Sequence, residues 1–164
     1  MRLGLLSDTH NSMANLRAAV DRFRRADVET VIHCGDLTSL EAALQLVEFQ
    51  VICTFGNGDW NANEIRQNLL YFHPENFGGL VFRGEIAGQK IAVTHGHIPG
   101  ILDDLILCGE YHYVFHGHSH RRRDEWVRST RVVNPGALGG KKVETRSCAI
   151  LELESGALTY ELID

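Results

Sequence analysis

The chain has 164 residues, of which 44% are hydrophobic and 23% charged, and its formal net charge at pH 7 is −5. These values are ordinary for one globular domain, expected to span residues 1–164, and they exclude disordered and collagen-like classes. The negative balance disfavours broad binding to nucleic acid or anionic lipid. No apolar run approaches the ~18 residues of a membrane span.

The N-terminal part of the chain alternates apolar strands with short helices. Strands are expected at residues 2–6, 30–33 and 51–55, and helices after residue 12 and at residues 39–48. This alternation of strands and helices predicts a parallel α/β sheet.

The pattern changes after residue 69. Further strands are expected at residues 70–73, 80–86, 90–94, 113–115, 125–128, 131–134, 148–153 and 158–162. A short helix is expected near residues 101–108, and the last four strands look antiparallel. We therefore expect an α/β fold in which two packed, mostly mixed β-sheets are flanked by helices.

Side chains able to bind metal ions follow five of the expected strands. In chain order these donors are Asp8 and His10, Asp36, Asn57, His95 and His97, and His118 and His120. Histidine is the commonest metal ligand in proteins, and the chain has nine histidines. Because the carboxyl ends of strands form the ligand crevice of open α/β sheets, we expect these donors to meet at one edge.

The same segments carry a family resemblance. They are Ser7-Asp8-Thr9-His10-Asn11, Gly35-Asp36-Leu37, Gly56-Asn57-Gly58-Asp59, Thr94-His95-Gly96-His97 and Gly117-His118-Ser119-His120. In this order they resemble the calcineurin-like metallophosphoesterases. The Asn134-Pro135-Gly136 segment also matches the small bacterial and archaeal phosphodiesterase branch. The resemblance runs from residue 1 to about residue 153 and implies an αββα sandwich with a dinuclear metal site at the carboxyl ends of its strands.

The resemblance also implies a ligand set. One metal would be held by Asp8, His10, Asp36 and His120. The second would be held by Asp36, Asn57, His95 and His118, with the carboxylate of Asp36 bridging the two. A bridging carboxylate suits the ~3.5–4 Å separation of two-metal sites. Catalytic roles are expected for Asp36, Asn57 and His97.

The donor types restrict the metal and the chemistry. Carboxylate, amide and imidazole donors without thiolate suit divalent ions of intermediate hardness. We expect two ions per chain, with Mn²⁺ first and Fe²⁺, Zn²⁺, Ni²⁺ and Co²⁺ as alternatives. Two adjacent dications would turn a bridging water into hydroxide and neutralise charge that develops on the substrate. The resemblance implies that this substrate is a phosphodiester.

One position departs from the wider family. Many members carry a histidine after the Gly-Asn pair, where it orients substrate and protonates the leaving group, but here that residue is Gly58. The phosphodiesterase branch also lacks this histidine, and loss of a general acid typically costs ~10²–10⁴ in rate. His97 is either a partner of a metal ligand or a substitute proton donor.

Other residues keep two interpretations. Asp59 either positions a water or metal ligand or caps the next helix. The basic cluster at residues 121–123 is either a solvated, protected edge or a guide for an anionic substrate. Asn134 either contacts substrate or forms a turn, whereas His33 is expected to be a hydrogen-bonded core residue.

The first functional hypothesis is a metal-dependent phosphodiesterase acting on a small phosphodiester or nucleotide-like substrate. The alternative is a metal-binding scaffold or regulatory protein of the same fold with little or no turnover, as in a retromer subunit that shares this fold. Competent donors at all seven predicted ligand positions favour the enzyme. No stable nucleic-acid or membrane binding is expected, and an exposed edge strand is compatible with a homodimer. Four scattered cysteines and no secretory signal favour the cytoplasm.

Overall fold

The computed structural model describes residues 1–163, and within them eleven strands form two sheets. The first sheet has the strand order β11 (Ala157–Ile163), β10 (Arg146–Glu152), β1 (Arg2–Leu6), β2 (Thr30–His33), β3 (Gln50–Thr54) and β4 (Phe77–Gly79). The second has the order β5 (Val81–Ile86), β6 (Gln89–Thr94), β7 (Tyr113–Phe115), β9 (Thr130–Asn134) and β8 (Arg123–Val127). Both sheets are mixed, as expected, since each has a parallel part and antiparallel strands at one or both sides.

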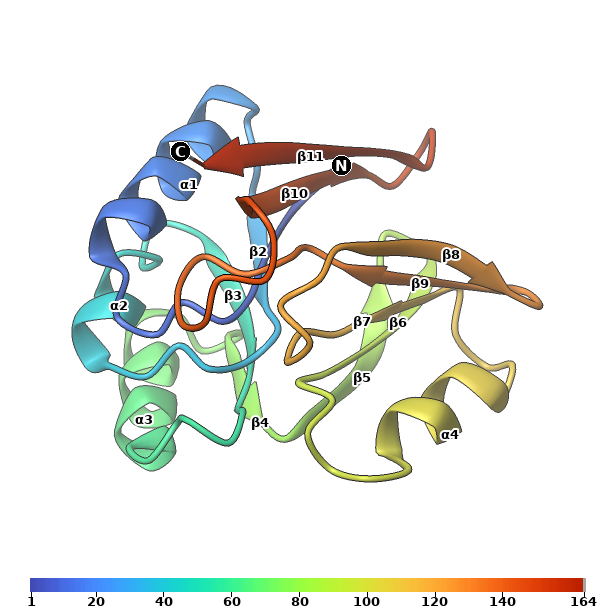
Figure 1. Cartoon of the computed structure of the whole chain (residues 1–164), viewed down its shortest axis with the longest axis horizontal. Helices are drawn as coiled ribbons and strands as arrows, with labels where there is room; N and C mark the ends of the chain where they lie inside the picture. The colour runs from blue at the N-terminus through green and yellow to red at the C-terminus, as the bar shows by residue number, and fades with distance from the viewer. Residues whose placement is uncertain (164) are drawn as a thin grey trace.

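Helices cover the outer faces of both sheets (Figure 1). Three of them lie on the first sheet: α1 (Met13–Arg25), α2 (Leu40–Leu44) and α3 (Ala62–Phe72). The fourth, α4 (Ile101–Leu107), packs on the second sheet. The order of layers is therefore helix, sheet, sheet, helix, which is the αββα arrangement implied by the resemblance.

Strand β1 shows why the layers stack in this way. Leu3 and Leu5 face the second sheet, where they join a core with Ile91 and Val93 of β6. The alternate residue Leu6 faces the helices. Because both faces of the strand are buried, its sequence is a continuous apolar run rather than an alternating one.

Helix α1 packs through a single stripe. Leu16, Ala19, Val20 and Phe23 recur at three- and four-residue spacing and are all buried. A Cβ at Gly4 would lie 2.9 Å from the Phe23 ring, so the missing side chain lets this ring sit on β1. Burial of one such large side chain stabilises the fold by about 1.5–3 kcal/mol. The packing brings the start of α1 next to the end of β1, where Asp8 lies.

The expected strand at residues 70–73 is wrong, because helix α3 extends to Phe72. Ile65 and Leu69, spaced by one helical turn, are the buried residues of this helix. Tyr71 is 84% exposed, so the apolar run that suggested a strand is not a buried one. Short apolar runs do not separate strand from helix by periodicity alone.

Two smaller expectations are also corrected. The helix expected at residues 39–48 ends at Leu44 and continues as turns, because Leu44 and Val47 lie at the surface and offer no apolar stripe to extend it. Strand β9 is antiparallel to β8, as expected, but it pairs in parallel with β7 on its other side. None of the helices within residues 1–163 is long and apolar enough to cross a membrane.

Candidate metal centre

The predicted donors follow the carboxyl ends of strands from both sheets. Backbone hydrogen bonds tie these strand-end loops together: the Asp8 N–H donates to the Gly35 carbonyl at 2.9 Å, and the Gly117 N–H donates to the His95 carbonyl at 3.1 Å. The loops after β1 and β2 are thus joined in one sheet, and the loops after β6 and β7 in the other. Because the two sheets pack against each other, the donor side chains at the carboxyl ends of their strands come together.

Two carboxylates stand at the middle of the centre. Oδ2 of Asp36 lies 3.5 Å from Nε2 of His10 and 3.5 Å from Nε2 of His95. Oδ1 of Asp8 lies 3.2 Å from Nε2 of His120, and 3.9 Å from Nε2 of both His10 and His95. Five of the predicted ligands therefore converge. Within residues 1–163 they form two groups with donor atoms within 4.8 Å of one another, Asp8 with His10 and His120, and Asp8 with Asp36 and His95.

Several donor atoms of this centre have no hydrogen-bond partner. Oδ1 of Asp8 and Nε2 of His10 and His95 are buried and unpartnered among the described residues. Buried polar atoms in proteins are nearly always paired, so each exception needs an explanation. Carboxylate oxygens and imidazole nitrogens gathered in this way are the donor types that bind divalent cations.

The other ring nitrogen of two histidines fixes their tautomer. Nδ1 of His95 lies 2.8 Å from the carbonyl of Cys34, and Nδ1 of His120 lies 2.8 Å from the carbonyl of Lys141. Because a carbonyl only accepts, both Nδ1 atoms carry the proton and donate. Each Nε2 therefore turns a free lone pair toward the carboxylates, as metal-binding histidines do.

The backbone at the ligand positions is strained. Left-handed φ values occur at the non-glycine residues Asp8 (52°), His10 (43°), Asp36 (57°), His118 (65°) and His120 (54°). Residues held in sparsely populated regions cost about 1–3 kcal/mol each and gather at functional sites. In each of these loops the chain turns sharply just after its strand, so that short segments aim their side chains at one point.

Two glycines lie too close to the centre to carry side chains. A Cβ at Gly56 would be 2.2 Å from Oδ1 of Asp36, and a Cβ at Gly117 would be 1.9 Å from Oγ of Ser7. Ser7 in turn donates to Oδ2 of Asp8 at 2.6 Å. Any larger residue at either position would displace a carboxylate of the centre.

The charges of the centre favour cation binding. Burial raises the pKa of Asp36, but the adjacent His95 imidazole and the hydrogen bond from the Gly58 N–H outweigh it and bring the pKa down to about 2. Burial lowers the pKa of His95, whereas Asp36 and Asp8 raise it, and the net direction is upward. The carboxylates are therefore ionised at neutral pH, and their negative charge attracts cations to the centre.

The three remaining predicted site residues lie at the rim. His118 is exposed, and its ring centroid is 5.1 Å from that of His95, outside the two close groups. Asn57 is exposed, and its loop is held beside Asp36 by the 2.7 Å hydrogen bond from the Gly58 N–H to Oδ1 of Asp36. His97 is half-buried, with its ring 5.3 Å from the His95 ring.

Asp59 joins two of the ligand loops. Its carboxylate accepts hydrogen bonds from the backbone N–H groups of Gly56 (2.7 Å), Thr38 (2.7 Å) and Asp36 (2.9 Å). The residue at the start of α3 is Asn61, so Asp59 does not cap that helix. Of its two interpretations, the one in which it positions a predicted ligand agrees with these contacts.

His33 has the core role expected from the sequence. Its Nδ1 accepts from the Gly35 N–H at 3.1 Å, and its Nε2 lies 2.9 Å from Oγ1 of Thr9. The ring is fully buried and links the loops after β1 and β2.

The loop after β9 contributes a contact that the sequence did not indicate. The carbonyl of Lys141 accepts the proton of His120, and a Cβ at Gly140 would lie 2.5 Å from the His10 ring. Gly140 has φ +62°, a conformation that glycine adopts freely. The paired glycines 139 and 140 were the available signal for this close approach.

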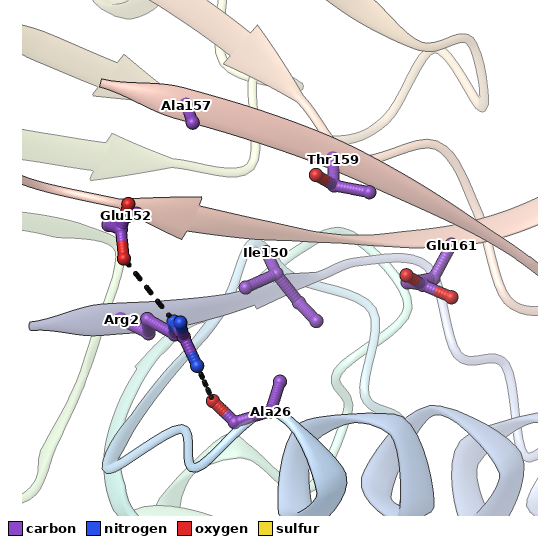
Figure 2. A pocket seen from close by; sticks show the side chains of 7 residues that line it. All are labelled: Arg2, Ala26, Ile150, Glu152, Ala157, Thr159 and Glu161. Atoms are coloured by element: carbon purple, nitrogen blue, oxygen red, sulfur yellow. Dashed lines mark hydrogen bonds and ion pairs between the residues drawn. The ribbon is translucent and has the colours of Figure 1, made fainter. Parts of the chain in front are cut away.

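A surface hollow lies elsewhere on the molecule. Figure 2 shows it between the end of α1 and strands β1, β10 and β11, lined by Arg2, Ala26, Ile150, Glu152, Ala157, Thr159 and Glu161. The Arg2 guanidinium donates to the Ala26 carbonyl at 2.9 Å and lies 3.5 Å from the Glu152 carboxylate. Arg2 begins β1 and Asp8 follows its end, so the hollow is at the opposite end of the strand from the candidate metal centre.

A two-sheet α/β sandwich with carboxylates and imidazoles converging at its strand ends is the architecture of metal-dependent hydrolases. The sequence profile of the calcineurin-like phosphoesterase superfamily domain matches residues 1–156. This chain belongs to the calcineurin-like phosphoesterase superfamily.

Individual relatives agree with this assignment. The chain is 35% identical over 156 residues to a protein of Methanocaldococcus jannaschii named phosphodiesterase MJ0936, covering 94% of each chain. It is 30% identical over 174 residues to a Bacillus subtilis protein named probable metallophosphoesterase YsnB, covering 100% of this chain and 91% of the relative. The solved structure of an archaeal phosphodiesterase superposes with a TM-score of 0.93 at 33% identity, covering 99% of this chain and 100% of the other.

Proposed function

We propose that this chain is a divalent-metal-dependent phosphodiesterase that hydrolyses a small phosphodiester or nucleotide-like substrate. The observation that carries the proposal is the convergence of two ionised carboxylates with three imidazoles, in which Oδ1 of Asp8 and Nε2 of His10 and His95 lack protein hydrogen-bond partners. The similarity to proteins named phosphodiesterases supports the diester as the substrate class.

The proposed ligand set is the one expected from the sequence. Asp8, His10, Asp36 and His120 would hold one ion, and Asp36, Asn57, His95 and His118 the other. The position of the Asp36 Oδ2 atom, 3.5 Å from a histidine of each group, supports Asp36 as the bridge. Mn²⁺ is the metal we propose first among the divalent ions that a mixed carboxylate, amide and imidazole donor set without thiolate suits. When bound, the two ions supply a water of lowered pKa and neutralise charge on the phosphoryl group.

Among the described residues the centre offers no accessible side-chain nucleophile. Ser7 and Cys34 are fully buried, and burial raises the pKa of the Cys34 thiol well above its usual value. Water is therefore the nucleophile. Asn57 orients the substrate, and His97 donates a proton to the leaving group from the rim of the centre.

Replacement of Asp36 tests the bridge. Asp36→Asn should lower metal content from two ions per chain to less than one and abolish most turnover, because the neutral amide is a weak bridge between two cations. Elemental analysis after saturation with Mn²⁺ and dialysis measures the metal, and a panel of cyclic and linear diesters and monoesters measures the activity. Asp103→Asn, an exposed residue of α4, is the matched control.

The result that contradicts the proposal is a wild-type chain that holds at most one ion under saturating Mn²⁺. A chain that holds two ions but cleaves no diester on the panel would favour the scaffold or regulatory alternative instead.

We also propose a cytoplasmic location. Cys34, Cys53 and Cys148 are buried and unpaired, which suits a reducing compartment. The homodimer stays a prediction, and analytical ultracentrifugation would test it by measuring the mass of the protein in solution.

A further inference from the structure

Asn134, the last residue of β9, is fully buried beside the loop that carries His118 and His120. Its Nδ2 donates to the Gly117 carbonyl at 2.9 Å and to Oγ of Ser119 at 3.1 Å. Its Oδ1 accepts from the Gly136 N–H at 2.9 Å. Both amide hydrogens are used and the residue is 0% exposed, so the side chain has no group left for a substrate.

The contact with Gly117 controls one peptide unit. The carbonyl of Gly117 and the N–H of His118 belong to the same planar group. Asn134 holds the carbonyl end, assisted by Nδ1 of His116 at 3.1 Å. The N–H end donates to Oδ2 of Asp8 at 3.1 Å. A rotation of this plane would therefore move a predicted ligand and release a hydrogen bond to a central carboxylate.

This peptide also closes a strained turn. The Ser119 N–H donates to the same Gly117 carbonyl at 2.7 Å, and the central residue His118 has φ +65°. Three-residue turns with positive φ at the centre are rare and strained. Strained conformations persist only where surrounding contacts over-determine them. Asn134, which arrives from another strand, supplies such a contact.

We infer that Asn134 is a positioning residue for the metal centre: through the Gly117–His118 peptide it holds His118 and Asp8 in their ligand geometry. The inference rests on the proposed function, since it assumes that these side chains bind metal. Of the two interpretations of Asn134 given by the sequence, the turn agrees with the hydrogen bond from the Gly136 N–H, whereas the buried amide leaves no group for a substrate. Loss of residues that orient metal ligands typically weakens metal affinity by about 10–100-fold.

The chain contains a matched control for this role. Asn76 is also a buried asparagine that satisfies two backbone groups, since it donates to the Leu69 carbonyl at 2.9 Å and accepts from the Val51 N–H at 2.7 Å. It lies next to the start of β3, at the end of the strand remote from Asn57. Loss of either amide should destabilise the metal-free protein, but only the loss of Asn134 should affect metal binding.

The experiment compares Asn134→Ala with Asn76→Ala. Calorimetric titration of metal-free protein with Mn²⁺ measures affinity, and urea unfolding of the same samples measures stability. We expect the half-saturating Mn²⁺ concentration to rise about 10–100-fold in Asn134→Ala and to stay at the wild-type value in Asn76→Ala. If Asn134→Ala does not fold, Asn134→Asp takes its place, because it keeps the volume and the acceptor for Gly136 but loses the amide donors.

Wild-type Mn²⁺ affinity in a folded Asn134 variant overturns the inference, and so does an equal loss of affinity in Asn76→Ala. If the wild type itself takes up no Mn²⁺, the proposed function fails first and the inference falls with it. The two failures are therefore distinguishable within one set of titrations.

Discussion

Gly58 leaves the candidate centre without the side chain that many family members place there. Its N–H donates to Asp36, and a Cβ added at this position would lie 3.1 Å from Oδ1 of Asp36 and 3.3 Å from Thr38. Its φ is not in the left-handed region. A side chain at position 58 therefore meets crowding rather than backbone strain, and Gly58→His requires a shift of a few tenths of an ångström. The proton for the leaving group must come from another residue, for which His97 is our proposal.

The dependence of rate on the leaving group tests His97. His97→Ala should lower kcat for diesters with alkyl leaving groups by about 10²–10⁴, because an alkoxide departs poorly without a proton. Activated aryl diesters should lose little, so the plot of rate against leaving-group pKa should become steeper in the variant. His112→Ala, an exposed histidine outside the centre, is the control. A slope that is the same in wild type and His97→Ala would exclude His97 as the donor.

Buried neutral histidine gives the metal-free protein a pH-dependent stability. Burial lowers the pKa of His33 to about 3. Below pH ~6.5 the unfolded chain protonates this ring and the native protein does not. The unfolded state then binds more protons, so this contribution to stability is lost as pH falls from about 6.5 toward 3.

We expect His33→Gln to remove this loss. The pKa of His33 is about 6.5 in the unfolded chain and about 3 in the native protein, so the range from pH 6.5 to 4.5 lies between the two values. In this range the free energy of unfolding of wild type should fall relative to that of the variant by about 1.4 kcal/mol per pH unit. Urea titrations of metal-free protein measure both. His95 and His120, whose pKa values are raised, act in the opposite direction in both proteins, so the difference isolates His33. Parallel curves for wild type and His33→Gln would contradict the expectation.

At the scale of elements, the loops after the strands are joined by side chains rather than by regular structure. The carboxylate of Asp59 connects the loop after β2 with the loop after β3 through three backbone N–H groups. The His120 imidazole connects the loop after β7 with the loop after β9. These contacts hold the ligand loops in place, so the conformation of each loop depends on a neighbouring loop.

The basic cluster at residues 121–123, at the start of edge strand β8, is largely neutralised by nearby acids. Arg122 pairs with Glu144 at 3.1 Å, and Arg123 pairs with Glu125. Converting residues 121–123 to Gln should leave kcat/KM and its dependence on ionic strength nearly unchanged. Stability should fall by about 0–1 kcal/mol per lost pair, because surface ion pairs are weak. Steady-state kinetics at several salt concentrations measure this. A large fall in kcat/KM with intact metal content would assign the cluster to substrate steering.

At the scale of the whole molecule, the candidate centre spans both sheets. Asp8 and Asp36 follow strands of the first sheet, whereas His95 and His120 follow strands of the second. The sheets also share the apolar core between β1 and β6. We propose that residues 1–164 form one domain that unfolds in a single transition, with bound metal acting as a second link between its sheets.

Metal removal tests this link. Chelation should lower the free energy of unfolding by about 2.7 kcal/mol for each ion removed, relative to protein held in Mn²⁺ at 100 times the dissociation constant. Amide exchange should increase in the loops after β1, β2, β6 and β7 more than in the strands of the shared core. Calorimetry and hydrogen–deuterium exchange measure the two effects. Unchanged stability after complete metal removal would mean that the ions do not join the sheets.

Much of the fold could be read from local pattern. The boundaries of β1, β2 and β7 agree with the apolar runs that predicted them, because strands buried on both faces have an unbroken hydrophobic signal. The donors were predicted to meet because each follows such a strand, and parallel strands end at one edge. Helix α3 was missed because the run ending at Phe72 has the composition of a strand, and only burial distinguishes the two.

The α/β class, the order of the strand-end segments and the types of donor that they carry were all predictable from the sequence. The backbone groups that hold those donors were not, because they depend on the packing of the two sheets. Asn134 meets Gly117, His120 meets Lys141, and Asp59 meets Asp36, each across at least 17 positions of the chain. Such contacts have no periodicity and no local propensity, since they arise when packed sheets bring distant loops within hydrogen-bond distance. The position of a loop in the sequence identifies the donor side chains that it carries, whereas the packing of the two sheets decides which distant residue forms a hydrogen bond with it.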